Sequence, residues 1–307
     1  MPRKTEFRSM FFFALVLSVL SVSPQYDTED QLILTRLILM QDSTTSQTFP
    51  LGYRKSRRIQ AILVPVSIFL AFLLWEGFVR LDNTPAFILP PPGLVWSRFL
   101  QVLGDGSLLR NALVTLGEVM AGLALGVSVA SALGYLLAKS PVVERLLSPY
   151  VVASQSIPIV AIAPLFVIWF GPGLFSKVLI CALIVFFPVL VNTIVGLRTV
   201  PDDLYDLMRS LKATRWQTFK ALEIPGAMPV FLGGLRIGAT LSVIGAVVGE
   251  FIGADRGLGF MINRARGQYD TALVFVTVFS LVLMAMSLYG VVVLLEHRLL
   301  SWRERPK

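Results

Sequence analysis

The sequence contains very few of the residues that usually carry redox or metal chemistry. Its 307 residues include one cysteine, Cys181, and one histidine, His297. One cysteine excludes a disulfide within the chain, and one thiol and one imidazole are a poor basis for a zinc or haem site. We therefore expect no metal and no cofactor bound by this chain alone.

Charged residues are also scarce. They make up 15% of the chain, against about 25% in soluble globular proteins, while 55% of the residues are hydrophobic and the mean hydropathy is +0.73. This composition excludes an ordinary soluble protein with a large catalytic domain. An enzyme embedded in the membrane would need clustered carboxylates, histidines or cysteines at membrane depth, which the apolar segments lack. The chain is predicted not to be an enzyme.

Six apolar segments are long enough to cross a bilayer, which takes about 20 predominantly apolar residues in a helix. We predict an all-α polytopic membrane protein with six transmembrane helices. The third segment contains Pro149, Pro158 and Pro164, so it should be kinked or divided into shorter pieces. The predicted spans are 59–79, 119–138, one within 146–176, 178–197, 226–252 and 271–295.

The placement of lysine and arginine accounts for the net charge of +8. With six spans, both termini lie on one side, and that side carries about twice as many basic residues as the other, which makes it cytoplasmic by the positive-inside rule. We therefore predict a multi-pass protein of the cell (inner or plasma) membrane with cytoplasmic termini. No basic groove interleaved with aromatic residues is present, so lipid and not nucleic acid is the expected partner of these charges.

Residues 1–56 are predicted to be an irregular N-terminal extension ending in a cytoplasmic basic segment, with the six-helix transmembrane domain occupying 57–305. The apolar run 10–22 has the size of a signal-peptide core, but Pro24 spoils the small-residue cleavage site that follows it. Insertion of this run would place the basic residues of 54–58 outside, against the charge rule. An extension is therefore favoured over a targeting signal.

Small residues recur at every fourth position in two of the predicted spans. The positions are 122, 126, 130, 134 and 138 in the second span, and 234, 238, 242 and 246 in the fifth, where 245, 249 and 253 form another series. Residues four apart share a helix face, and small residues there let helices approach closely in lipid. We expect tight internal packing, with sliding of the helices during a conformational cycle as the alternative.

The loop of about 198–225, between the fourth and fifth spans, is predicted to form two short amphipathic helices. Asp202 or Asp203 is a suitable N-cap for the first. The sequence from Thr214 to Gln217 fits a capping box that starts the second. The first helix would carry its apolar face on Leu204, Leu207, Met208 and Leu211. Such a pair of helices is either an inert hairpin on the lipid surface or a docking element.

This loop resembles the EAA loop of the inner-membrane permease subunits of binding-protein-dependent ABC importers, in particular the nitrate, sulfonate and taurine group. Asp206 stands where that family has glutamate, and Lys212 stands where it has glycine. Glu118 stands where we expect a basic residue. The stretches that carry the resemblance, in family order, are 87–92, 155–161, 163–165, 169–173, 187–188, 206–213, 222–229, 249–253 and 257–259.

The resemblance implies a type I ABC importer fold and a permease that works as a homodimer, with an ABC ATPase subunit dimer and an extracytoplasmic substrate-binding protein as partners. No G-x-x-x-x-G-K-[ST] phosphate loop occurs in the chain, so ATP would be bound by the separate ATPase subunit. The residues implied to dock on that subunit are Leu204, Asp206, Leu207, Met208, Arg209, Leu211, Lys212, Ala213, Ile224 and Pro225.

Candidates for the transport pathway are polar or charged residues at membrane depth. Gln155, Ser156 and Asn192 come from the third and fourth spans, and Arg236 and Glu250 from the fifth. The two charged residues either line the pathway or brace the dimer, or they pair locally, because a charge at the centre of a span costs about 3 kcal/mol. The implied solutes are anions such as nitrate, sulfonates and taurine, or vitamin and pyrimidine precursors such as riboflavin. The alternative function is a non-transporting membrane scaffold or assembly protein.

Overall fold

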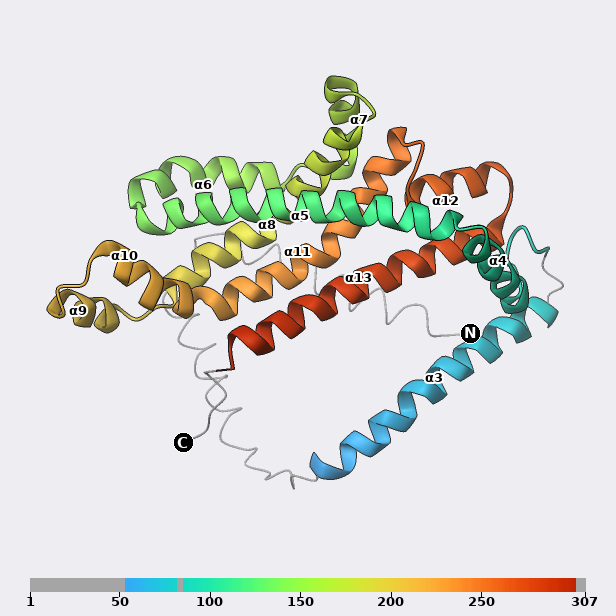
Figure 1. Ribbon diagram of the computed structural model, residues 1–307, viewed down its shortest axis with the longest axis horizontal. Helices are drawn as coiled ribbons and strands as arrows, with labels where there is room; N and C mark the ends of the chain where they lie inside the picture. The colour runs from blue at the N-terminus through green and yellow to red at the C-terminus, as the bar shows by residue number, and fades with distance from the viewer. Residues whose placement is uncertain (1–52, 82–84, 302–307) are drawn as a thin grey trace, which may run out of the picture. The chain divides into compact units, whose positions relative to one another are not determined.

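The structure, a computed structural model, describes residues 53–81 and 85–301 (Figure 1). The predicted extension up to residue 52 and its apolar run 10–22 lie outside the described residues. The chain divides into two units, 1–67 and 68–307. The helices and contacts described below belong to the second unit, except that helix α3 begins in the first.

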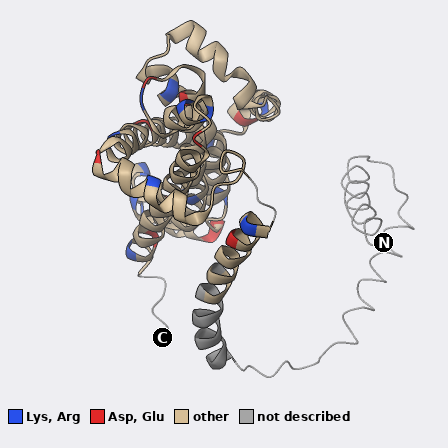
Figure 2. Cartoon of the chain, turned by 90° about the vertical axis from the view of Figure 1, so that its right-hand side faces the viewer, with Lys and Arg blue, Asp and Glu red and all other residues tan. Residues whose placement is uncertain are grey.

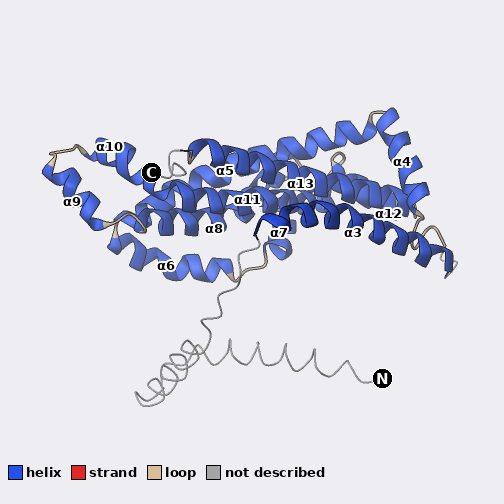
Figure 3. Ribbon diagram, turned by 90° about the horizontal axis from the view of Figure 1, so that it is seen from below, coloured by secondary structure: helices blue, strands red, loops and turns tan. Residues whose placement is uncertain are grey.

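Every regular element in the described residues is a helix, as Figure 3 shows. The elements are α3 (Tyr53–Leu81), α4 (Pro92–Gly104), α5 (Ser107–Lys139), α6 (Pro141–Gln155), α7 (Ile159–Phe170), α8 (Leu174–Arg198), α9 (Asp202–Ser210), α10 (Arg215–Thr218), the π-helix η1 (Phe219–Glu223), α11 (Ile224–Gly253), α12 (Leu258–Gly267) and α13 (Thr271–Leu299).

Four stretches of helix in the described residues are long and apolar enough to cross a membrane: α5, α8, the continuous stretch 215–253 and α13. Helices α6 and α7 meet at an angle of 96° and together could form a fifth span. This bend confirms the predicted break in the third segment, since Ile159 starts a new helix directly after Pro158. Charged positions are few along these helices (Figure 2).

The predicted second span, 119–138, lies within a longer helix. Helix α5 begins at Ser107 and passes through Glu118 without interruption. The charge of Glu118 does not end the helix because its side chain is buried and paired with Lys177 of α8. A buried charge with a partner therefore does not mark the end of a helix.

Helix α8 lies between α5 and α11, and the small-residue faces of both neighbours are directed at it. A Cβ atom on Gly122 of α5 would lie 2.2 Å from Cβ of Cys181, and one on Gly245 of α11 would lie 2.8 Å from Cα of the same residue. Further along, Gly234 of α11 packs directly on Asn192. The predicted tight internal packing is confirmed.

The two ends of the bundle differ in construction. Helices α9 and α10 lie at one end, whereas α4 and α12 lie at the other (Figures 1 and 3). At the α12 end, Val102 of α4, Leu258 of α12 and Val276 of α13 belong to one apolar core. The ring of Trp75 in α3 stacks on Phe275 of α13, with 5.2 Å between their centroids.

Candidate functional site

Helix α9 starts from a proline and not from an aspartate cap. Pro201 is the N-cap residue, with φ of −61° and ψ of 140°, and no side chain caps the helix. The prediction that Asp202 or Asp203 is the cap is therefore wrong. Both carboxylates lie in the first turn, where they interact favourably with the positive end of the helix dipole, while the ring of Pro201 fixes the direction in which the chain enters.

The turn after α9 is tight although it lacks the glycine of the family pattern. Lys212 adopts a left-handed conformation with φ of 55°. Its N–H donates to the carbonyl of Arg209 at 2.9 Å, and the N–H of Ala213 donates to the carbonyl of Met208 at 3.0 Å. This bond pattern is a Schellman motif, which normally has glycine at the left-handed position.

The second predicted helix of the loop exists but is not separate. Thr214 and Gln217 form the predicted capping box, with bonds of 3.3 and 2.7 Å between side chain and backbone. Helix α10 then continues through η1 into α11. The predicted second helix therefore starts at the expected place but is the first part of a longer helical stretch, 215–253. The wide π turn ends at Glu223, two residues before Pro225, and it lets the helix continue through a residue that cannot donate a backbone hydrogen bond.

The apolar face of α9 is exposed. Leu204, Leu207 and Leu211 all face solvent, and Leu211 is 68% exposed, whereas Met208 is half-buried. Arg209 forms an ion pair with Asp206 at 2.9 Å beside this face. The adjoining space between α9 and the start of α11 is a cavity of about 780 Å³ that includes Leu204 and Pro225 in its lining. An exposed leucine row on a short helix outside the bundle is typical of a protein-docking surface.

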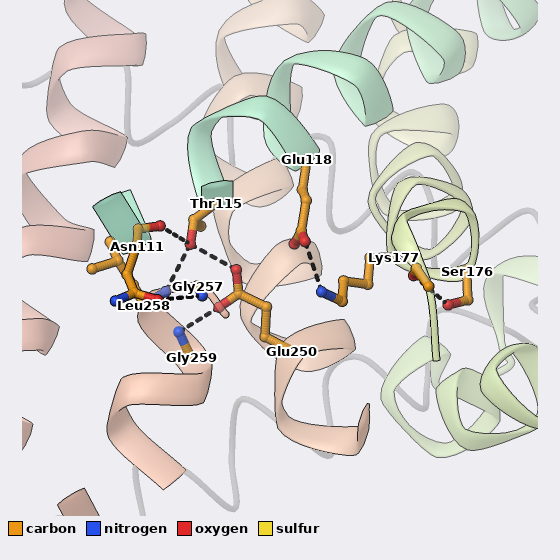
Figure 4. Close-up of polar contacts among 10 residues, drawn as sticks. Asn111, Thr115, Glu118, Ser176, Lys177, Glu250, Gly257, Leu258 and Gly259 are labelled. Carbon is orange, nitrogen blue, oxygen red and sulfur yellow. Dashed lines mark hydrogen bonds and ion pairs between the residues drawn. The ribbon is translucent and has the colours of Figure 1, made fainter. Parts of the chain in front are cut away.

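The opposite end of the bundle contains a buried polar network (Figure 4). The carboxylate of Glu250 in α11 accepts hydrogen bonds from Thr115 of α5, at 2.6 Å, and from the backbone N–H of Gly259. The Thr115 hydroxyl in turn accepts a bond from the N–H of Leu258 at 2.8 Å. The Asn111 amide oxygen accepts one from the N–H of Gly257 at 2.7 Å.

This network fixes the start of α12. The donors are three successive backbone N–H groups at its N-terminus, which a helix leaves unpaired unless a side chain accepts from them. A Cβ at Gly257 would lie 2.1 Å from Glu250 Oε1, and φ there is 115°, so only glycine fits. Side chains of α5 and α11 thus serve as the caps of a third helix.

An ion pair lies beside this network. Lys177 Nζ of α8 is 2.8 Å from Glu118 Oε1 of α5, and both side chains are buried (Figure 4). Sequence reasoning singled out Glu118 as a departure from the family pattern, but it did not predict the pairing of Glu118 with Lys177 or a role for Thr115 and Asn111. The signal that could have found Lys177 is its position between two apolar segments, since a buried lysine needs a carboxylate partner.

The five pathway candidates are distributed over several parts of the bundle. Gln155 and Ser156 are exposed at the bend between α6 and α7, whereas Asn192 donates to the carbonyl of Pro188 at 2.8 Å. Arg236 forms an ion pair with Glu296 of α13 and lies 5.3 Å from the ring centroid of Tyr289. Both charged candidates, Arg236 and Glu250, therefore have partners within the protein.

Fold and site together define a multi-pass helical membrane protein with an exposed amphipathic loop and no catalytic constellation in its described residues. A family model described as "Binding-protein-dependent transport system inner membrane component" matches residues 122–301. The chain belongs to this family and is a permease subunit of a binding-protein-dependent ABC importer in the inner membrane. The predicted non-enzymatic role is confirmed, and the family implies an ATPase and a binding protein as partners.

Several relatives of this chain are named for the solute that they transport. The riboflavin transport system permease protein RibX of Chloroflexus aurantiacus is 46% identical over 242 residues, which cover 79% of this chain and 90% of that protein. The formylaminopyrimidine transport permease protein ThiX of Halalkalibacterium halodurans is 36% identical, with coverage of 81% and 99%. The taurine transport system permease protein TauC of Escherichia coli is 29% identical, with coverage of 86% and 98%.

The fold also matches a solved transporter. A chain of the MetNI methionine ABC transporter, in inward-facing conformations, aligns with a TM-score of 0.56 at 19% identity, over 63% of this chain and 96% of that chain. At this identity the match concerns the fold alone.

Proposed function

We propose that this permease carries riboflavin or a related pyrimidine precursor into the cell. The observation that carries this proposal is the 46% identity to RibX over 90% of that protein. ThiX, with 36% identity, is also named for a heteroaromatic solute, whereas TauC, named for a sulfonate, is 29% identical. Specificity would come mainly from the binding protein, and the polar candidates Gln155, Ser156 and Asn192 would line a pathway of low affinity.

The substrate proposal is tested by uptake. Cells that cannot make riboflavin would express this chain together with its ATPase subunit and binding protein, and uptake of labelled riboflavin would be measured. We expect ATP-dependent uptake that unlabelled riboflavin competes away and taurine does not. Uptake of labelled taurine without uptake of labelled riboflavin would contradict the proposal, and an assembled complex that moves neither solute would exclude riboflavin as its substrate.

The number of spans and the orientation of the chain in the membrane are also part of the proposal. Six spans, with α3 as the first and cytoplasmic termini, give the type I importer arrangement, with two copies of this chain per transporter. In favour of α3 as a span, its side chains Phe69, Leu70 and Leu74 are exposed and apolar. The transmembrane domain would occupy 57–305, after an extension over 1–56.

The loop of 198–225 is proposed to be the coupling element that docks on the ATPase subunit. The supporting observation is that Leu207 and Leu211 are exposed on a helix at the end of the bundle. The rest of the proposed contact set consists of Leu204, Asp206, Met208, Arg209, Lys212, Ala213, Ile224 and Pro225.

The docking proposal is tested with the double variant Leu207→Asp, Leu211→Asp. Two carboxylates on the apolar face should prevent capture of the ATPase subunit by the purified permease, while membrane insertion is unchanged because both side chains already face solvent. The matched control is Leu103→Asp on α4, an exposed leucine at the other end of the bundle, which should leave capture intact. Equal capture by all three proteins would overturn the docking role.

A further inference from the structure

One ammonium group at the loop end of the bundle contacts two elements of the loop. Lys139 is the last residue of α5, and its Nζ lies 2.5 Å from Glu223 Oε1, at the end of η1. The same Nζ donates to the hydroxyl of Tyr205 on α9 at 3.2 Å and lies 4.7 Å from the centroid of that ring. Lys139 thus joins a long membrane helix to both halves of the loop.

Burial distinguishes this pair from the other ion pair of the loop. The Glu223 side chain is 6% exposed and that of Lys139 is 36% exposed. By contrast, Asp206 and Arg209 are both largely exposed, and such pairs contribute little. Removing the ammonium of Lys139 would leave the Glu223 carboxylate buried without a countercharge, which is strongly unfavourable.

The π turn contributes to this arrangement. One additional residue in a turn rotates the side chains that follow by about 100° relative to a continuous α-helix. Glu223 is the last residue of the π turn, and Phe219, the first, packs edge-on against Tyr135 of α5 with 5.3 Å between centroids. Both ends of η1 are therefore held against α5.

We propose that Lys139 is a positioning residue that couples the docking loop to the membrane helices. Through Tyr205 and Glu223, it ties α9 and η1 to α5, so that a displacement of α9 moves α5 and α11 together. Without these contacts, α9 would still present its leucine face, but its displacement would be absorbed by the connections at 199–201 and 211–214. This inference rests on the docking role proposed above.

The test compares docking with coupling in the complete transporter. Wild type, Lys139→Met, Lys139→Arg, Glu223→Gln and the charge exchange Lys139→Glu with Glu223→Lys would be reconstituted with the ATPase subunit and the binding protein. Lys220→Met is the matched control, because Lys220 is an exposed lysine of the same π-helix. The two readouts are capture of the ATPase subunit and stimulation of ATP hydrolysis by the binding protein.

We expect Lys139→Met and Glu223→Gln to capture the ATPase subunit normally but to lose stimulation by about tenfold or more, a loss typical of coupling energies between sites. Lys139→Arg and the charge exchange should restore most of the stimulation, and Lys220→Met should behave as wild type.

Normal stimulation in Lys139→Met, or loss of capture together with stimulation, would overturn the proposal. If Lys139→Met does not fold, failure of the charge exchange to recover stimulation overturns it. The docking role itself would instead be refuted if the variant with Leu207→Asp and Leu211→Asp captured the ATPase subunit as well as wild type does.

Discussion

At the scale of single residues, Lys212 combines a side chain with a backbone conformation that favours glycine. Its left-handed φ of 55° is a conformation that costs a residue with a Cβ about 1–2 kcal/mol. The Schellman bonds around it show that the fold needs the turn. The family pattern has glycine at this position for the same physical reason.

We expect Lys212→Gly to stabilise the permease by about 0.5–1 kcal/mol, because the relief of left-handed strain exceeds the extra flexibility of glycine in the unfolded chain. Thermal unfolding of the purified protein in detergent would measure this as a higher Tm. Ser210→Gly is the control, since Ser210 lies in the last turn of α9 with helical geometry and its replacement should lower the Tm. A lower Tm for Lys212→Gly would contradict our account of the turn.

Glu250 of α11 has a different role, because its carboxylate accepts a hydrogen bond from a backbone N–H at the start of another helix, α12. Replacing it with alanine removes the acceptor of Gly259 and the partner of Thr115, both of which are buried. We expect a loss of about 3 kcal/mol, since buried donors are left unsatisfied beside the charged pair of Glu118 and Lys177. Hydrogen exchange would show faster opening of the amides at 257–259.

The matched control for Glu250 is Asp255→Ala, which removes an exposed carboxylate from the loop between α11 and α12. It should change neither the Tm nor the exchange of these amides. If both variants behave alike, Glu250 is not what holds the start of α12.

At the scale of elements, the packing of α5 on α8 depends on the absence of side chains. Gly122→Ala would place a Cβ 2.2 Å from Cβ of Cys181, so the helices must separate. We expect a destabilisation of about 1–3 kcal/mol, typical of an overpacked core. Gly117→Ala, in the same helix, has no atom within 4 Å of its new Cβ and should stabilise the protein slightly through helix propensity. Thermal unfolding of both variants tests the pair, and a Gly122→Ala protein as stable as Gly117→Ala would exclude close packing at this face.

The elements also show how far sequence reasoning extends. Long apolar runs identify the helices, and the small-residue series identify the faces along which α5 and α11 pack. The partner of those faces, α8, could not be predicted, because the residues that meet the glycines, such as Cys181 and Ala182, form no pattern of their own.

Long-range pairing was equally inaccessible. Two ion pairs join residues that are far apart in the chain, Lys139 with Glu223 and Glu118 with Lys177. Nothing in the local sequence relates the partners to each other. The apolar face of α9 could be recognised because its pattern is local, with leucines three and four residues apart. The π turn could not, since it depends on how Pro225 is accommodated in the folded bundle.

At the scale of the whole molecule, the region that matches the family model begins well inside the chain. The family model starts at residue 122, and the match to RibX covers 79% of the chain. Deletion of residues 2–50 is therefore expected to leave insertion, ATPase capture and uptake unchanged. Deletion of 2–80, which removes nearly all of α3, is the control that should abolish assembly. Loss of uptake with the shorter deletion would show that the extension takes part in transport.

Cys181 offers an internal reporter for the bundle. Its thiol is completely buried between α5 and α11 and is the chain's single thiol. A maleimide can reach it only after α8 separates from its neighbours, so the labelling rate of the unmodified protein measures the opening of the helix core. Cysteines introduced at the surface can thus be labelled selectively without first removing the native one.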